Sequence, residues 1–170
     1  MVSGIGPRAG RIRTVNDSSR INPDYVEAIF ETVNTSAFPK HIAFRLTALD
    51  FDSCRVDLDI CAQHFQPFGI VHGGVLATLI DTATFWAAFM RLPEDSGLVN
   101  VDLKLNYLKS GIAGRLTAEG HCLRAGKLIS YAEASVYNDA RELLAHGTST
   151  LMALPGKGLP IPYPKFLESR

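Results

Sequence analysis

The most apolar part of the chain, residues 66–90, reads QPFGIVHGGVLATLIDTATFWAAFM and carries an aspartate, Asp81, near its centre. Residues 69–90 alone are long enough to cross a bilayer. An aspartate in the middle of such a span costs roughly 2.5 to 3.5 kcal/mol, and the histidine and threonines of the segment weaken a membrane span further. The pattern therefore favours a long helix buried on most sides, opened by Gly73 and Gly74 and ended before Pro93.

The spacing of apolar side chains differs on the two sides of this segment. Residues 22–34 carry them at helical spacing behind Pro23, which is typical of a short amphipathic helix with proline in its first turn. Elsewhere the apolar positions alternate with polar ones, as in a strand with one exposed face. This alternation predicts strands at residues 43–49, 52–61, 98–108, 115–124, 129–138 and 142–154.

The last four of these strands are joined by short, turn-like connections, SGIAG, AGK and NDAR. Consecutive strands joined in this way pair antiparallel, so we expect a meander. In the first of the four, the alternation sets Val101, Leu103, Leu105 and Tyr107 on one face and the polar residues between them on the other.

The order of elements is a helix, two strands, one long buried helix and four strands, which predicts an α+β domain. An antiparallel sheet with its helices on one face is the layered arrangement that buries such a helix. We expect residues 1–20 to be a flexible arm, residues 21–154 a single domain, and residues 155–170, rich in proline and glycine, an irregular extension.

The composition narrows the classes of partner and location. Seventeen basic residues balance seventeen acidic ones, so no overall charge attracts nucleic acid or an anionic membrane. Cys54, Cys61 and Cys122 have no CxxC spacing, which argues against a disulfide framework or a structural zinc site. The basic N-terminal segment lacks the apolar run of a secretory signal, and a cytoplasmic location fits best. Without a metal cluster, a Walker loop or a dinucleotide fingerprint, the sequence implies no bound cofactor.

Asp81 is the most informative polar residue, because an ionised carboxylate in apolar surroundings is costly unless it is compensated. Either it bonds a neighbouring hydroxyl or amide, or it has a chemical function. His72 is more readily explained as a histidine that bonds backbone near the helix start than as a catalyst. Gly73 and Gly74 allow close packing, yet a helix that opens on glycine also leaves backbone N–H groups free to polarise a carbonyl.

The segment QPFGIVHGGVLATLID resembles the signature of the hotdog-fold acyl-CoA thioesterases, above all the phenylacetate-pathway (PaaI-type) subgroup. The signature is a polar amide residue, then HGG, then an acid on the same helix. The resemblance covers residues 42–154 and includes GLVNVDLKLNYLKSG, which looks like the family's strand after the helix. It implies a hotdog fold, in which an antiparallel sheet wraps around one long central helix, and hydrolysis of acyl-CoA without a bound cofactor.

Carried over residue by residue, the resemblance implies a catalytic set. Asp81 is the nucleophile or the general base, and the N–H of Gly73 is the oxyanion donor. Gln66 stands where the family has an amide near the thioester, and Asn100 where a polar residue orients water or substrate. His72 matches the motif histidine, whose role we take as mainly structural.

The spacing of Gly73 and Asp81 adds a prediction about assembly. The two residues are eight positions apart, which on one helix separates them by about 12 Å along its axis. A reacting carbonyl must lie about 3 Å from both its donor and its attacker. If both residues act on one substrate, they come from different subunits, and a two-fold dimer then holds two equivalent sites. We therefore expect a homodimer or a dimer of dimers, as in the family.

Several residues are candidates for substrate binding. Gly74 and Phe85 lie within the signature, although some relatives carry a hydroxyl residue at the position of Phe85, which leaves the detailed mechanism open. Basic residues in or beside turns are candidates for the CoA phosphates, although such residues more often only solvate a surface. They are Lys109, Arg115, Arg124 and Lys127.

An aromatic or medium-chain acyl group fits the aromatic residues of the segment, although aromatics at helical spacing more often form core. They are Phe65, Phe68, Phe85, Trp86 and Phe89. Two alternatives remain at this point. One is a non-catalytic acyl-CoA-binding or sensing module of the same fold. The lack of a recognisable output domain in this sequence counts against a sensor. The other is a hotdog-type dehydratase, whose histidine and acid are arranged differently.

Overall fold

The computed structural model describes residues 19–167, so the expected arm at residues 1–20 lies almost wholly outside the described residues. The elements in chain order are β1 (Arg20–Ile21), α1 (Pro23–Thr35), α2 (Ala37–Ile42), β2 (Phe44–Asp50), β3 (Ser53–Asp59), the 3-10 helix η1 (Ala62–His64), α3 (Gly73–Phe89), β4 (Ser96–Tyr107), β5 (Arg115–Arg124), β6 (Ile129–Tyr137), β7 (Leu143–Pro155) and β8 (Phe166–Leu167).

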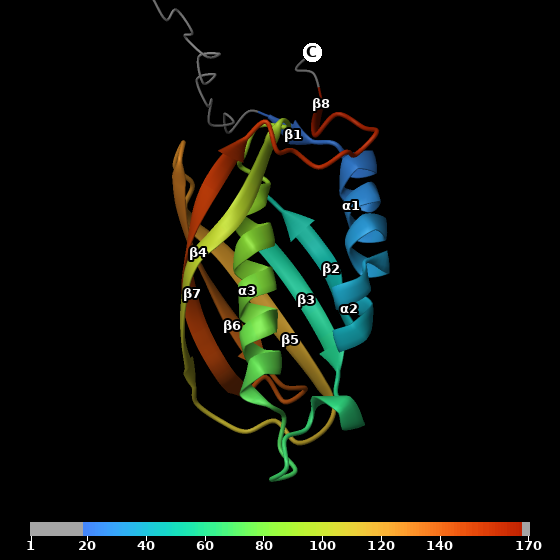
Figure 1. Ribbon diagram of the computed structural model, residues 1–170, viewed down its shortest axis with the longest axis vertical. Helices are drawn as coiled ribbons and strands as arrows, with labels where there is room; N and C mark the ends of the chain where they lie inside the picture. Colours follow the sequence, from blue (N-terminus) through green and yellow to red (C-terminus); the bar gives the residue numbers. More distant parts are fainter. Residues whose placement is uncertain (1–18, 168–170) are drawn as a thin grey trace, which may run out of the picture.

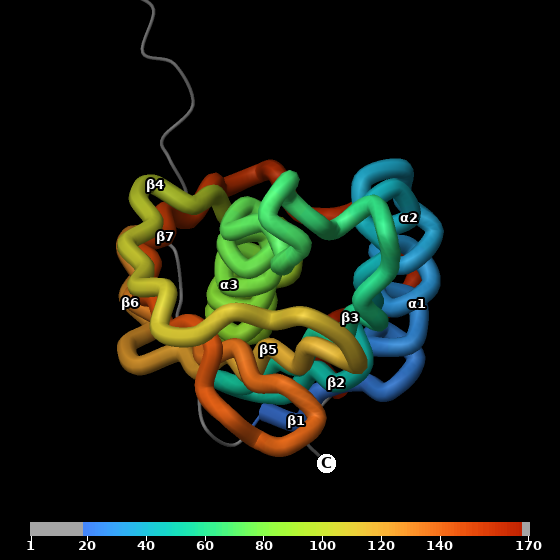
Figure 2. The backbone as a smooth tube through the Cα atoms, turned by 90° about the horizontal axis from the view of Figure 1, so that it is seen from below, coloured from blue at the N-terminus to red at the C-terminus, as the bar shows by residue number. Residues whose placement is uncertain are grey.

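An antiparallel sheet of six strands curves around the long helix α3, in the order β2-β3-β5-β6-β7-β4. Figure 2, seen along α3, shows the sheet on two sides of the helix and α1 and α2 beyond β2 and β3. Helix α1 packs on β2 (Figure 1). The expected α+β hotdog fold, with one long helix inside an antiparallel sheet, is confirmed.

Helix α3 is buried as its apolar composition predicts, because most of its side chains are enclosed by the sheet. Helix and sheet approach each other closely at Gly120 of β5, where a Cβ atom would lie 2.3 Å from the carbonyl oxygen of Ala83. Only glycine allows this distance, so Gly120 fixes how deeply α3 sits in the sheet.

The order of the strands corrects one expectation. Strands β5, β6 and β7 form the expected meander, but β4 pairs with β7 and not with β5. The segment between β4 and β5 is a crossover: the Gly111 carbonyl accepts a hydrogen bond from the N–H of Val71, beside the start of α3. β5 pairs with β3 instead. The prediction was wrong because a short connection does not force its two strands to be neighbours.

A β-bulge in β4 corrects the expected alternation of that strand. The pairing of β4 with β7 skips Val101, and this side chain is 58% exposed, not on the face of Leu103 and Leu105. The extra residue changes which positions face the helix. As a result Asn100 points toward α3 and bonds Asp81.

The C-terminal segment packs on the domain and ends in an element of its own. β8 pairs with β1, so the two ends of the described chain lie side by side near the C-terminal end of α3 (Figure 1). Lys165 is fully buried there, and its ammonium donates to the carbonyl oxygens of Phe89 and Leu92 at 2.6 and 2.9 Å. The segment therefore caps the end of the central helix.

Two further findings concern residues 19–167 only. None of the helices in this range is both long and apolar enough to cross a membrane. The same range holds no group of three or more histidine, cysteine or acidic side chains placed to bind a metal ion.

Candidate active site

The start of α3 is built by the glycine pair and the histidine before it. His72 is the N-cap residue, and its Nδ1 accepts a hydrogen bond from the N–H of Gly74 at 2.8 Å. This bond supports the structural role expected of His72 and requires Nδ1 to be unprotonated. Because the cap takes the N–H of Gly74, it does not use the N–H of Gly73, which has no acceptor within the helix. That N–H lies at the positive end of the helix dipole.

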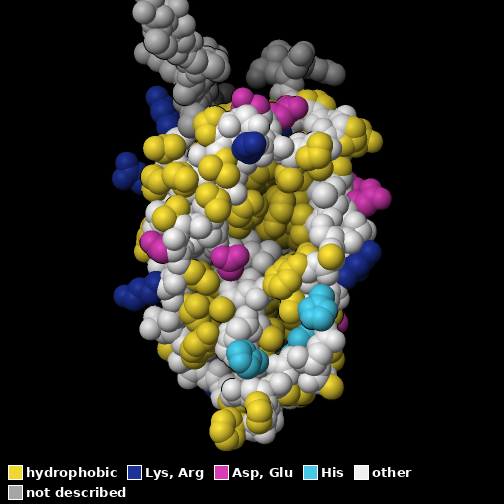
Figure 3. Space-filling view, viewed as in Figure 1, with side chains coloured by type: hydrophobic (Ala, Val, Ile, Leu, Met, Phe, Trp, Pro, Cys, Tyr) yellow, Lys and Arg dark blue, Asp and Glu magenta, His cyan; other side chains and the backbone are white. Residues whose placement is uncertain are grey.

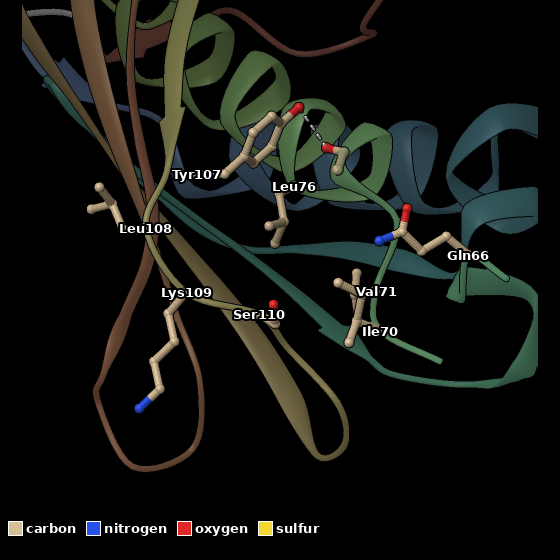
Figure 4. Close-up of a pocket in the computed structure, with 9 residues that line it drawn as sticks. Gln66, Ile70, Val71, Leu76, Tyr107, Leu108, Lys109 and Ser110 are labelled. Atoms are coloured by element: carbon tan, nitrogen blue, oxygen red, sulfur yellow. Dashed lines mark hydrogen bonds between the residues drawn. The ribbon is translucent and has the colours of Figure 1, made fainter. Parts of the chain in front are cut away.

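The loop before α3 presents Gln66 to the same place. The N–H of Gln66 donates to the carbonyl of Ile70, and Gly69, with φ +74°, donates back to the carbonyl of Gln66. This tight turn needs the positive φ that glycine adopts without strain. The side-chain amide of Gln66 extends toward the start of α3 (Figure 4).

A pocket of about 400 Å³ lies at this end of the helix. It brings together three of the candidate residues, namely Gly73, Gln66 and Lys109. Apolar side chains such as Leu76 form part of its wall (Figure 4). A pocket with an apolar wall, a free helix N–H and a side-chain amide suits a ligand that carries a carbonyl group.

Tyr107 is a residue of this pocket that sequence reasoning assigned only to the apolar face of a strand. Its hydroxyl donates to the carbonyl oxygen of Gly73 at 3.1 Å (Figure 4). A Cβ atom on Gly73 would lie 2.9 Å from the phenol ring. Only the pairing of β4 with β7, with Tyr107 opposite Ala145, reveals this position.

Asp81 lies in the middle of α3 and is paired with Asn100. The Nδ2 of Asn100 donates to the Asp81 carboxylate at 2.5 Å. Burial raises the pKa of the Asp81 carboxyl above its ordinary value, and the hydrogen bond from Asn100 opposes this rise. The Oδ1 of Asn100 is buried and has no partner among the described residues. An acid with a raised pKa beside an unsatisfied acceptor is typical of a functional position.

The two candidate groups are separate within one chain. Asp81 does not line the pocket that contains Gly73. The seven intervening residues are all helical, so the two residues are about 12 Å apart along the axis. One chain thus presents a donor at one place and an acid at another.

The candidate aromatic residues divide between core and surface. Trp86 and Phe89 are buried, while Phe85 is half-buried and stacks on Phe89 with ring centroids 5.9 Å apart. Phe65 and Phe68 of the loop are exposed. A hollow lined with hydrophobic side chains opens between the C-terminal half of α3 and α1 (Figure 3).

The basic candidates are not gathered at one place. Lys109 lines the pocket and is paired with Glu142, and Arg115 is held by Asp59 at 2.7 Å. Arg124 is at the other end of β5 from Arg115, about 30 Å away. Lys127 follows Arg124 in the turn to β6. The structure therefore brings Lys109, but not Arg124 or Lys127, to the pocket of the same chain.

Comparison with known proteins shows which family this chain is similar to. Residues 68–145 match the family model described as "Thioesterase superfamily". The matched range contains the glycine pair, Asp81, Asn100 and Tyr107.

Two relatives and one solved structure illustrate the similarity. A 1,4-dihydroxy-2-naphthoyl-CoA hydrolase of Listeria monocytogenes is 26% identical over 65% of this chain and 89% of its own length. The medium/long-chain acyl-CoA thioesterase YigI of Escherichia coli is 30% identical over 49% of this chain and 62% of its own. The structure of the E. coli PaaI protein superposes with a TM-score of 0.72 and 20% identity, covering 81% of this chain and 98% of that one, which shows a shared fold.

Proposed function

We propose that this chain is a thioester hydrolase of the superfamily that its residues 68–145 match, and that it cleaves acyl-CoA thioesters to the free acid and CoA. The names of the relatives support this substrate class, since one is a CoA hydrolase and another an acyl-CoA thioesterase. The observation that carries the proposal is the N–H of Gly73 at the helix start, which has no acceptor among the described residues and lies in a pocket sized for part of such a substrate.

In this reaction the thioester carbonyl accepts a hydrogen bond from the N–H of Gly73. The helix dipole adds to this stabilisation of the oxyanion. The Asp81 carboxylate either attacks the carbonyl carbon or removes a proton from the attacking water. The buried Oδ1 of Asn100 is an acceptor suited to hold that water, and Gln66 is placed to bond the thioester group.

The reaction requires a second copy of the chain, because one helix separates Gly73 from Asp81 by about 12 Å. The edge strand β4 supports this assembly. β4 pairs with β7 on one side only and exposes Val99 and Val101, which are 39% and 58% accessible. A long edge strand with exposed apolar side chains is a surface that pairs with another strand.

The course of β4 along α3 indicates how two copies would meet. Asn100 of β4 is bonded to Asp81, and Tyr107 of the same strand is bonded to Gly73. In an antiparallel pair of β4 strands related by a two-fold axis near Lys104, Asn100 of one copy comes level with Tyr107 of the other. The acid of one chain then lies near the oxyanion donor of its partner.

The experiment is release of CoA from a panel of acyl-CoAs, followed with a thiol reporter. Asp81→Asn keeps the shape of the side chain and removes the base. We expect a loss of about 10²- to 10⁴-fold in kcat, the usual range for general acid–base catalysis. Glu27→Gln neutralises an exposed carboxylate on α1 and serves as the control with unchanged activity. Unchanged hydrolysis by Asp81→Asn would refute the role of Asp81, and binding of acyl-CoA without CoA release would favour a non-catalytic module.

A further inference from the structure

Two successive glycines open α3 where the proposed reaction needs a rigid donor. Glycine restricts its own backbone less than any other residue, so the peptide groups at Gly73 and Gly74 need outside support. An oxyanion donor has its effect only if it is fixed before the reaction. The structure shows what provides that support.

The peptide group between Gly73 and Gly74 is held at both ends. Its N–H donates to Nδ1 of His72, and its carbonyl accepts the hydroxyl of Tyr107. Tyr107 is itself fixed: it pairs with Ala145 of β7, and the next residue, Leu108, donates its N–H to the carbonyl of Leu144 at 2.8 Å. The first turn of α3 is therefore tied to the sheet through one phenol.

We propose that Tyr107 is a positioning residue for the oxyanion donor. Its hydrogen bond to the Gly73 carbonyl fixes the backbone rotation at Gly73, and with it the direction of the adjoining N–H into the pocket. The ring also lies so close to Gly73 that a side chain at this position would meet it at 2.9 Å. The inference rests on the proposed function, because it assigns Tyr107 a role through the donor of that reaction.

The test uses Tyr107→Phe, which removes the hydroxyl and keeps the ring as a wall of the pocket. Loss of one neutral hydrogen bond that acts only through the donor lowers kcat by about ten-fold. KM stays within about two-fold, since the groups that bind the substrate are intact. Tyr131→Phe, which removes a hydroxyl from a half-exposed tyrosine on the far face of the sheet, is the matched control and keeps wild-type kcat.

A second variant separates positioning from general structural support. Gly73→Pro deletes the donor N–H itself, and proline needs no N–H at the first position of a helix. In that background Tyr107→Phe should cause no further loss of kcat, whereas a structural role would lower activity again. If the Gly73→Pro protein does not fold, the split between kcat and KM in Tyr107→Phe alone decides.

The outcomes are distinguishable from failure of the proposed function. If the wild-type protein releases no CoA, the proposed function fails before Tyr107 is tested. If the wild type releases CoA and Tyr107→Phe keeps its kcat, the positioning role is wrong. A rise in KM alone, or an additive loss in the Gly73→Pro background, would also overturn it.

Discussion

Replacement of Lys165 by methionine tests whether the C-terminal segment caps the central helix through a buried amine. The ammonium lies 4.1 Å from the centre of the Phe89 ring and donates to two carbonyl oxygens at the end of α3. Burial lowers the pKa of the Lys165 amine from 10.5 to about 7, and the Glu94 carboxylate opposes this fall. Methionine has a similar length and does not titrate.

The sign of the pH dependence follows from the lowered pKa. Between about pH 7 and 10.5 the unfolded chain binds a proton on Lys165 that the folded chain does not. As the pH rises through this window, the free energy of unfolding of the wild type therefore increases by up to about 1.4 kcal/mol per pH unit relative to that of the methionine variant. The methionine also leaves two carbonyl oxygens without this donor, at about 1–3 kcal/mol each.

We thus expect Lys165→Met to be clearly less stable than the wild type at pH 10 and to approach it as the pH falls toward 7. Urea unfolding followed by fluorescence of Trp86, the one tryptophan of the chain, measures both proteins at equal concentration. Other groups that titrate in the same range affect both proteins equally, so their contribution cancels in the difference between the two unfolding free energies. Parallel stability curves from pH 7 to 10 would show that the amine is not buried as described.

Two further predictions concern the acid and the helix contact. Asn100→Ala removes the hydrogen-bond donor that lowers the pKa of Asp81. The acidic limb of the pH–kcat profile, where protonation of Asp81 abolishes activity, should therefore move to higher pH. A limb that does not move would argue against the pairing of Asn100 with Asp81. Gly120→Ala places a methyl group 2.3 Å from the Ala83 carbonyl oxygen. It should lower the free energy of unfolding by about 1–3 kcal/mol, which a thermal unfolding experiment detects as a lower midpoint. An unchanged midpoint would contradict this contact.

The local periodicity of the sequence predicts most of the elements. Strand β5 has the expected bounds, and α1 and α3 begin within a residue of the positions that Pro23 and Gly73 mark. Side-chain burial determines these elements, so their signal is local. The short helix α2 has no such signal, because it spans six residues and contains Pro39. Strands of two residues, such as β1 and β8, are likewise too short to show the alternation of apolar and polar residues.

Features that depend on contacts between residues far apart in the sequence could not be predicted from local patterns. The crossover that sets β4 beside β7, and the bulge at Val101, place Asn100 next to Asp81 and Tyr107 next to Gly73. The resemblance to known thioesterases named Asn100, but neither alternation nor spacing pointed to Tyr107. Lys165 was missed for the same reason, since its burial comes from a tail whose proline and glycine content suggested only irregular chain.

The central claim is that Gly73 of one chain and Asp81 of another serve one thioester. Gly73→Pro removes the donor N–H, and His72 before it has φ −63° and ψ 135°, a conformation that a following proline accepts. Gly73→Ala has the same Cβ contact with Tyr107 and keeps the N–H, so it is the matched control.

The decisive measurement is the activity of an equal mixture of Gly73→Pro and Asp81→Asn chains, exchanged by mild unfolding and refolding. In a mixed dimer one site carries both substitutions and the other carries neither. With random pairing, half of the dimers are mixed and each has one intact site, so about a quarter of wild-type activity should return. A mixture that stays as inactive as its two components would contradict a site shared between chains.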